Sequence, residues 1–327
     1  MNSLNSPFTV KNCTFSPRLF LAPMAGISHS AFRRLCADFG GYGALYTEML
    51  SPSALLKEEL TTSPFTKRRD SEGLVVYQIK LNGDEDLAPV IERLKACDAA
   101  AIDLNLGCPA PAIRRTGAGK ALFDNIEKLK PVLATIRSLW PRLFSVKCRV
   151  GDNTEGWEER FTERVRLFEN SGIDSLCVHP RFSDEKLKRY ARWHLFDWIR
   201  TQTKLPLIAN GDIKDAAALD LLRHCDGLMI GREAVTRPWI FKTLSDSEPA
   251  FDFKEVWLRF FNYTLEDFPK EKAIGRIKEF TIYYAKNFFF GHELFRAVQP
   301  SPDLTTLKAN ALRFFERYAG KGDLGNP

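Results

Sequence analysis

Eight short apolar runs mark the first 235 residues, and polar segments of helical length separate most of them. The runs lie at residues 18–24, 44–49, 74–79, 101–106, 144–150, 175–180, 206–212 and 227–232. Their apolar positions are mostly continuous rather than alternating, which is typical of parallel strands buried on both faces. Eight strands alternating with helices predict an α/β fold, namely a (β/α)8 TIM barrel.

A doubly wound parallel sheet is the alternative for such an alternation. That fold would favour a G-x-G-x-x-G turn after its first strand, whereas the first strand here ends in "APMAGIS". The sequence therefore favours the barrel.

The pattern changes near residue 245. A polar segment with a proline, "SDSEPAFDF" (245–253), follows the last strand, and residues 254–319 carry only helical periodicity. We predict a barrel domain over residues 1–245 and a small all-helical domain over residues 246–327. The many aromatic residues of the second domain indicate a packed core, and a platform for stacking nucleic-acid bases is the alternative.

Composition and charge narrow the class of protein. The chain has 327 residues, a formal net charge of +6 and seven cysteines without a C-x-x-C pair. The scattered, odd set of cysteines argues against a disulfide framework or a metal site and favours a reducing compartment. The chain start lacks the features of a signal peptide, and no apolar stretch is long enough to span a membrane. We expect a cytoplasmic monomer, and the mild positive charge permits a polyanionic partner.

Polar or loop-forming residues follow the predicted strands. In a TIM barrel the active site lies at the carboxyl ends of the strands, so these residues are expected to meet there. Taken singly, each also has a purely structural explanation, such as a loop cap or a satisfied core histidine. They are Pro23, Met24, Ala25, Glu48, Gln78, Asn105, Cys108, Lys147, Arg149, His179, Asn210, Gly211, Asp212, Gly231 and Arg232.

The last two strands indicate a phosphate site. "ANGD" (209–212) and "IGRE" (230–233) place a glycine and backbone N–H groups just before predicted helices, where barrels bind phosphate. Arg232 can add a bidentate contact. With Lys147 and Gln78 deeper in the barrel, the pattern fits flavin mononucleotide (FMN). Lys147 would offset charge on the reduced ring, Gln78 would bond its pyrimidine edge, and Met24 would lie against the ring system.

Seven segments then resemble, in order, the motifs of the tRNA-dihydrouridine synthases. They are "LAPMAGIS", "TEM", "DLNLGCP", "SVKCR", "CVHPR", "IANGD" and "MIGRE", and they span residues 21–233. The resemblance implies an FMN enzyme that uses NADPH to reduce the C5–C6 double bond of specific uridines in tRNA. It does not assign a subfamily or the modified uridine.

The resemblance also implies roles for individual residues. Cys108 takes the place of the catalytic cysteine, Asn105 and Arg149 those of uracil contacts, and Tyr190 lies where some members have an aromatic residue beside the substrate. The implied flavin contacts are Pro23, Met24, Gln78, Lys147, His179, Asn210, Asp212, Gly231 and Arg232, together with the adjacent Ala25 and Gly211.

The chemistry explains a thiol between Gly107 and Pro109. Hydride addition at C6 leaves negative charge that a proton at C5 must quench, so an acid is needed on the face of the uracil away from the flavin. A thiol, with an ordinary pKa of about 8.5, is mostly protonated at neutral pH and can give its proton up. The alternative for Cys108 is a small buried hydrophobic residue.

Basic residues are expected to rim the catalytic mouth and contact tRNA phosphates. We expect this of Arg114 and Arg115, of residues 67–69 ("KRR") and of the basic stretch 181–193. Because a stacked uracil is out of reach in folded RNA, the nucleotide must turn out into the pocket.

Two positions depart from the family pattern. Pro180 stands where the family has glycine in "H-G-R", and Lys120 where a small residue is usual, so that its charge is left to meet flavin, RNA or solvent. Two other functions remain open: an FMN barrel dehydrogenase acting on a free pyrimidine such as dihydroorotate, and a flavin-bound tRNA chaperone without turnover.

Overall fold

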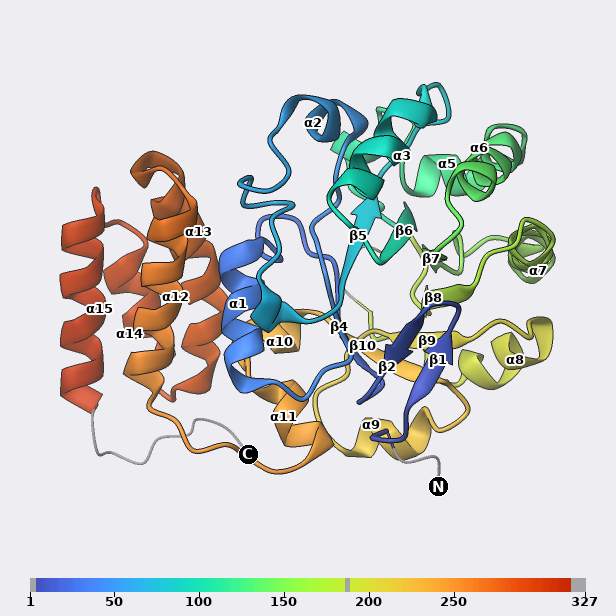
Figure 1. The fold of residues 1–327 in the computed structure, drawn as a ribbon. Helices are drawn as coiled ribbons and strands as arrows, with labels where there is room; N and C mark the ends of the chain where they lie inside the picture. Colours follow the sequence, from blue (N-terminus) through green and yellow to red (C-terminus); the bar gives the residue numbers. More distant parts are fainter. Residues whose placement is uncertain (1–3, 186–188, 319–327) are drawn as a thin grey trace.

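The computed structural model describes residues 4–185 and 189–318 and contains the predicted barrel. Eight parallel strands close in the order β10-β3-β4-β5-β6-β7-β8-β9 (Figure 1). Their bounds are β3 Leu19–Leu21, β4 Ala44–Tyr46, β5 Val75–Ile79, β6 Ala101–Leu106, β7 Leu143–Arg149, β8 Ser175–His179, β9 Leu207–Asn210 and β10 Gly227–Ile230. Every predicted strand is confirmed, and most end one to three residues earlier than the apolar run.

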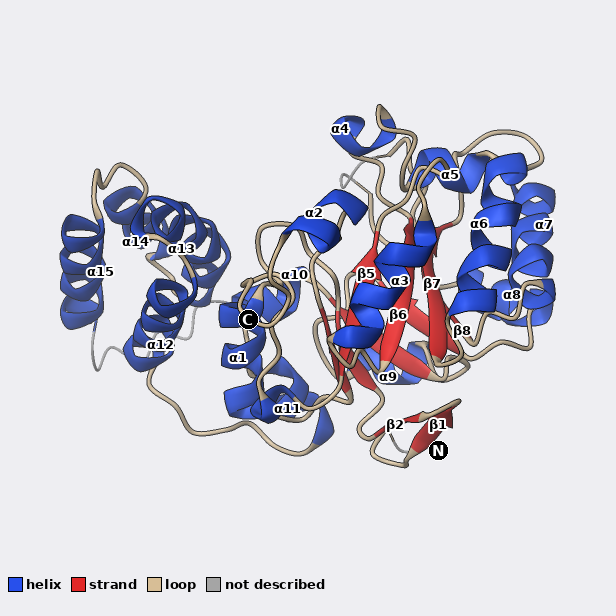
Figure 2. Ribbon diagram, turned by 45° about the horizontal axis from the view of Figure 1, so that its top comes forward, coloured by secondary structure: helices blue, strands red, loops and turns tan. Residues whose placement is uncertain are grey.

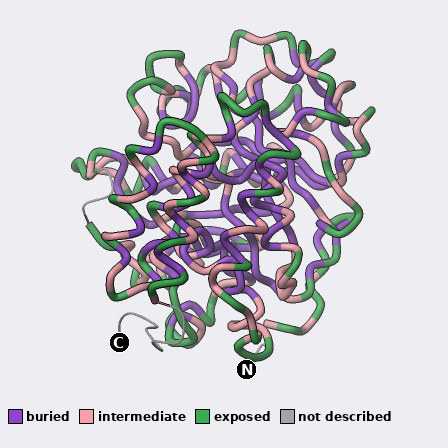
Figure 3. Tube along the Cα trace, turned by 90° about the vertical axis from the view of Figure 1, so that its left-hand side faces the viewer, coloured by how far each residue is buried: buried purple, intermediate pink, exposed green. Residues whose placement is uncertain are grey.

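Helices surround the barrel in sequence order (Figure 2). They are α1 Ser30–Phe39, α2 Pro52–Lys57, η1 Asp70–Glu72, α3 Leu87–Ala96, α4 Pro111–Arg114, α5 Lys120–Asp124, α6 Ile126–Leu139, α7 Trp157–Asn170, α8 Leu195–Gln202, α9 Ala217–Leu221, α10 Arg232–Thr236 and α11 Ile240–Ser245. Figure 3 shows the buried stretches running through the interior, with exposed residues at the turns.

The strands alternate between two apolar clusters. In β6, Ile102, Leu104 and Leu106 pack outward with the helices, whereas Ala101 belongs to the cluster inside the barrel. Successive side chains of a strand point to opposite faces, so Asp103 and Asn105 also face inward.

A short hairpin that the sequence pattern did not predict covers the amino-terminal end of the barrel. β1 (Phe8–Val10) and β2 (Cys13–Phe15) pair antiparallel. Between them, the Asn12 amide donates to the carbonyl of Ala100 and accepts from the N–H of Leu143, both next to strand starts. The opposite end of the barrel remains for a site.

Four longer helices and one short turn follow the barrel and lie beside α1 (Figure 1). They are α12 Phe253–Asp267, α13 Lys270–Tyr284, η2 Ala285–Asn287, α14 Gly291–Val298 and α15 Leu304–Tyr318. Their aromatic residues pack on one another, as in the stacked pair Phe260 and Phe280, whose ring centroids are 4.0 Å apart. The predicted helical core is therefore present, and the same apolar cluster continues into Phe32 of α1.

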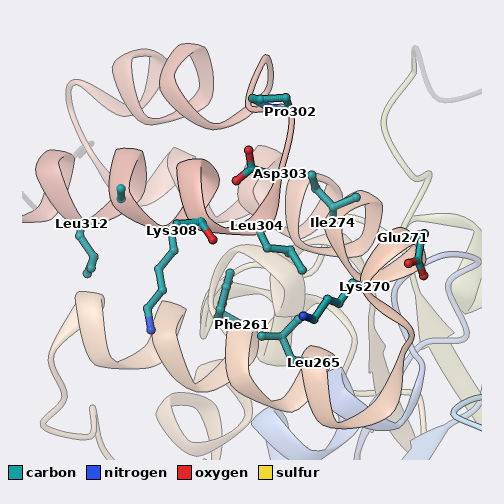
Figure 4. Close-up of a pocket in the computed structure, with 12 residues that line it drawn as sticks. Phe261, Leu265, Lys270, Glu271, Ile274, Pro302, Asp303, Leu304, Lys308 and Leu312 are labelled. Atoms are coloured by element: carbon teal, nitrogen blue, oxygen red, sulfur yellow. The ribbon is translucent and has the colours of Figure 1, made fainter.

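A groove of about 690 Å³ lies within these helices (Figure 4). Its lining comes only from α12, α13, α15 and the residues just before α15, with Phe261, Ile274 and Leu312 among its apolar members. The groove is thus separate from the strand ends of the barrel.

Candidate functional site

The inward-facing residues at the carboxyl ends of the strands form one polar layer. Gln78 aligns with Asp103 across β5 and β6, Asn105 with Lys147 across β6 and β7, and Arg149 with His179 across β7 and β8. The structure brings these side chains together, because neighbouring strands are in register at these positions.

Hydrogen bonds join the centre of this layer to the cysteine loop. Gln78 Nε2 donates to Asp103 Oδ2 at 2.7 Å, and Asn105 Nδ2 donates to Gln78 Oε1 at 3.0 Å. The backbone N–H of Cys108 then donates to Asn105 Oδ1 at 3.1 Å. The amide of Asn105 therefore ties the loop that carries the thiol to the barrel wall.

The loop around Cys108 is shaped by close backbone approaches. A Cβ at Gly119, whose φ is +62°, would lie 2.9 Å from the carbonyl oxygen of Cys108. A Cβ at Gly107 would lie 3.1 Å from the carbonyl carbon of Cys148. The Cys108 side chain is partly exposed, unlike the buried thiols of Cys148 and Cys177.

Lys147 lacks a partner for its charge. Within residues 4–185 and 189–318, its ammonium group makes no ion pair and no hydrogen bond. It faces the barrel interior near the buried Asp103, and its charge lowers the pKa of that carboxyl, although burial dominates and raises it to about 6. An unpaired ammonium in such a position fits an absent anionic group.

Positive charge also surrounds His179. Burial, and then the charges of Lys147, Arg149, Arg181 and Arg232, hold the pKa of His179 well below its ordinary value, so the ring is neutral. Burial and the nearby Arg181 lower the pKa of Arg149 to about 10. The site is therefore electropositive and suited to a phosphate.

Asp212 organises the two outer arginines. Its carboxylate accepts from Arg181 Nη2 at 2.7 Å and from Arg232 Nη2 at 2.8 Å. Among the residues that the structure describes, Nε and Nη1 of the buried Arg181 and Nε2 of His179 have no hydrogen-bond partner. Unpaired buried donors are costly, so a bound anion would satisfy the two N–H groups of Arg181.

The backbone of Gly211 packs closely against the ring of His179. Its φ is +119°, and a Cβ there would lie 2.6 Å from His179 Cδ2 and 2.8 Å from Ala191 Cβ. Only glycine fits this turn. Gly231 has more room, since a Cβ built there would lie 3.7 Å from the sulfur of Met24, an ordinary packing distance.

The first strand end approaches the C-terminal helices. The turn with Pro23, Met24 and Ala25 is held where the N–H of Gly26 donates to Glu48 Oε2 at 2.8 Å. Arg276 of α13 approaches Glu48 Oε1 at 3.6 Å. Asn210 ends β9, the neighbour of β10, and its side-chain amide donates to the carbonyl of Met229 in β10 at 2.8 Å.

The predicted basic rim is only partly present. Arg114 and Arg115 are exposed, and within the described residues neither forms an ion pair. Tyr190 is 83% exposed. Lys186, Leu187 and Lys188 of the basic stretch lie outside the described residues.

The assignment of Lys67 and Arg69 to the rim was wrong. Both pair with Asp267 at the end of α12, at 2.5 and 2.8 Å. Both lie in the connection between β4 and β5, and their ion pairs with Asp267 place them at the junction with the C-terminal helices. Lys120 is buried and pairs with Asp124 and Asp152, so its charge meets neither flavin, RNA nor solvent.

The sequence did not predict the place of two residues in this site. Asp103 stood in "DLNLGCP" without a role, and Arg181, which stood in "CVHPR", was assigned only to the basic rim as the first residue of the stretch 181–193. A charged residue two positions from a predicted site residue in the same strand or turn was the available signal, because such residues share a face.

The sequence model of the dihydrouridine synthase (Dus) family matches residues 20–312, which covers both the barrel and most of the C-terminal helices. The chain belongs to the dihydrouridine synthase family. The tRNA-dihydrouridine synthase B of Proteus vulgaris is 32% identical over 241 residues, 72% of each chain. The enzyme of that name from Pectobacterium carotovorum is 34% identical, over 69% of this chain and 71% of its own.

Solved structures with the same fold are more distant in sequence. The old yellow enzyme homologue of Zymomonas mobilis superposes with a TM-score of 0.56 at 13% identity, covering 78% of this chain and 96% of its own. The old yellow enzyme of Trypanosoma cruzi gives 0.54 at 10%, covering 81% and 97%. These likenesses confirm the barrel fold of this dihydrouridine synthase family member.

No described helix is both long and apolar enough to cross a membrane.

Proposed function

We propose that this chain reduces the C5–C6 double bond of uridines in tRNA to dihydrouridine, with FMN bound at the barrel mouth and NADPH as reductant. The observation that carries the proposal is the charge of Lys147, unpaired among the described residues, beside a ring nitrogen of His179 and guanidinium N–H groups of Arg181 that have no partner there either, at the strand ends of a barrel of this family. When bound, the flavin supplies hydride to the uracil ring.

The donors divide between two parts of such a cofactor. Arg181, Arg232 and the backbone of the Gly211 and Gly231 turns would hold the phosphate, which is dianionic and matches their charge. Lys147 and the remaining N–H of Gln78 would meet the polar edge of the ring system, and Met24 would pack against it. Pro180, which is buried, still accepts a hydrogen bond from Arg192 N but donates none.

The remaining polar residues would serve the uracil. Asn105 retains one amide proton after donating to Gln78, and the buried Arg149 guanidinium donates to the carbonyl of Phe182 at 3.0 Å. Cys108, on the loop held by Asn105, would give the proton to C5. Tyr190, Arg114 and Arg115 would contact the surrounding RNA from the exposed rim.

The experiment uses the purified holoenzyme under anaerobic conditions. The flavin released on denaturation is identified by chromatography, and FMN is expected. The holoenzyme is then reduced with NADPH and mixed either with tRNA lacking dihydrouridine or with a free pyrimidine. We expect reoxidation and new dihydrouridine only with tRNA. Turnover of orotate or uracil alone would identify a small-molecule dehydrogenase, and binding of tRNA without turnover would identify a chaperone.

A further inference from the structure

A buried carboxylate that the proposed chemistry does not use lies directly beneath the site. Asp103 is 0% exposed and aligns with Gln78 on β5 and with Ser145 on β7. Ser145 Oγ donates to Asp103 Oδ1 at 2.6 Å, and Gln78 Nε2 donates to Asp103 Oδ2 at 2.7 Å. Three adjacent strands thus place one acid between two donors.

Asp103 determines which group donates and which accepts in each of the hydrogen bonds that lead from it to Cys108. An ionised carboxylate only accepts hydrogen bonds, so Gln78 must turn its NH₂ group toward Asp103. Its oxygen then faces Asn105, which must present its own NH₂ group. The oxygen of Asn105 is left to accept the backbone N–H of Cys108.

Without the acid, only the backbone N–H of Cys108, at the other end of the chain of hydrogen bonds, would fix this order. A primary amide has a donor and an acceptor at nearly equivalent positions, so two facing amides can bond equally well after both have turned over. In the reversed order Asn105 would present NH₂ to the Cys108 N–H, and two donors cannot bond. The reversed order also exchanges the groups that Gln78 and Asn105 present toward the barrel mouth.

We propose that Asp103 is a positioning residue that fixes the amide orientations of Gln78 and Asn105 and, through Asn105, the loop that carries Cys108. The ionised form is the one that accepts from both neighbours, and Ser145, Gln78 and the charge of Lys147 all favour it against the cost of burial. The inference rests on the proposed function for its FMN measurement, whereas the loop measurement stands without it.

The decisive variant is Asp103→Asn in the holoenzyme. Asparagine has nearly the same shape but can donate to Gln78, so the reversed order becomes available. We expect the Kd for FMN to rise about 3- to 10-fold, the range of one net hydrogen bond. We also expect alkylation of Cys108 by iodoacetamide, followed by peptide mass spectrometry, to accelerate at least about threefold as its loop loosens. Cys97 and Cys225 serve as internal references, since both are partly exposed outside the site.

A compensating double variant distinguishes an effect of amide orientation from an effect of altered packing at position 103. In Asp103→Asn with Gln78→Glu, the new carboxylate at position 78 accepts both from the amide introduced at position 103 and from Asn105, which restores the orientation of Asn105. The alkylation rate of Cys108 should return to the wild-type value, whereas FMN binding should stay weak because residue 78 has lost its donor. Asp98→Asn, at a carboxylate 77% exposed at the other end of the barrel, is the matched control and should change neither measurement.

Three results would overturn the proposal. One is an Asp103→Asn protein whose FMN Kd and Cys108 alkylation rate both stay within about twofold of wild type. Another is failure of the double variant to restore the alkylation rate. If Asp103→Asn does not fold, Ser145→Ala decides, because it removes one donor to the carboxylate and should shift both measurements in the same direction by a smaller factor. Unchanged values in that variant would also overturn the proposal. A shift in Cys108 reactivity without FMN bound to the wild type would support the positioning role and count against the flavin function.

Discussion

Cys108 carries the most specific chemical expectation at the scale of single residues. It is a partly exposed thiol on a loop fixed by Asn105, whereas Cys148 and Cys177 are buried in the barrel wall. If Cys108 donates the proton, Cys108→Ala should retain FMN and NADPH oxidation, because neither needs the acid. Reoxidation of the reduced holoenzyme by tRNA should slow by about 10²- to 10⁴-fold.

Anaerobic stopped-flow absorbance of the flavin measures this rate. Cys97→Ala is the control, since that thiol bonds to the carbonyl of Leu94 at the end of α3 and lies outside the site. Equal rates in wild type and Cys108→Ala would leave Cys108 as a packing residue.

Single site residues could be predicted from the sequence where they lie near the end of a predicted strand. Gln78, Asn105 and Lys147 lie within the last four residues of apolar runs, and all three were found. Asp103 lies inside such a run, and its partners Gln78 and Ser145 come from strands 25 and 42 residues away. Its environment depends on strand register, which the pattern of one chain does not specify.

At the scale of elements, the short helix α4 presents the two rim arginines. Arg114 ends α4 and Arg115 follows it, both exposed, on the loop between β6 and α5 that also carries Cys108. Replacing both by alanine should weaken tRNA binding and lower the slope of log K against log salt by about one unit per lost phosphate contact. Binding measured over a salt series checks this.

FMN content should not change in that double variant, which distinguishes lost RNA contacts from a damaged site. Arg166→Ala with Arg223→Ala, on α7 and after α9, provides a matched loss of two charges elsewhere. A salt slope equal to that of wild type would place the RNA path away from α4.

Helix α13 reaches the first strand end of the barrel, which no apolar pattern could reveal. Arg276 lies 3.6 Å from Glu48, and Glu48 accepts the N–H of Gly26 beside Met24. Burial raises the pKa of Glu48, and the charge of Arg276 opposes that rise. Arg276→Ala should therefore loosen the turn at Pro23–Met24 and raise the Kd for FMN about 3- to 10-fold.

Titration of the apoprotein with FMN, followed by flavin fluorescence, measures that change. Arg276→Lys should retain part of the affinity, since it keeps the charge, and Arg296→Ala on the exposed side of α14 should match wild type. The N–H of Met24 also donates to Ser28 Oγ at 2.8 Å. An unchanged Kd in Arg276→Ala would mean that this hydrogen bond and the barrel hold the turn without Arg276.

The strands and C-terminal helices were predicted well because burial on both faces and helical periodicity leave a direct mark in the sequence. The hairpin β1–β2 was not, since three-residue strands carry too little pattern to stand out. The contact between α13 and the barrel was missed for another reason: Arg276 and Glu48 are far apart in sequence, and each alone is an ordinary polar residue.

For the whole molecule, the junction between barrel and C-terminal helices is a continuous apolar core rather than a polar interface. Phe32 of α1 lies 6.3 Å from Phe260 and 6.2 Å from Phe280, measured between ring centroids. Arg34 pairs with Glu266, and Asp38 with Arg259, around this core. The division at residue 245 therefore remains a prediction about sequence organisation, and we expect the two parts to unfold together.

His29 sits in this junction and gives it a pH dependence. The side chain is 0% exposed, and its ring lies 4.9 Å from that of Phe268, measured between centroids. Neither ring nitrogen has a hydrogen-bond partner in the part of the chain that the structure describes. Burial, and then the charges of Arg276 and Arg33, hold its pKa in the folded protein well below 6.5. The folded state thus excludes a proton that the unfolded chain takes up below about pH 6.5, so stability is full above that pH and falls as the pH drops.

The contribution of one such histidine approaches about 1.4 kcal/mol per pH unit below pH 6.5. His179 acts in the same direction, whereas the raised pKa values of Asp103 and Glu48 act in the opposite direction, so the total slope does not isolate His29. The difference between wild type and His29→Leu does, because leucine has similar volume and no titration. Urea unfolding of the FMN-saturated proteins between pH 7.5 and 5.5 should show the free energy of unfolding falling more for wild type than for His29→Leu, by about 1.4 kcal/mol over this range. Parallel curves would mean that His29 takes up its proton in the folded state, and the junction would then have to hold a charge within its aromatic core.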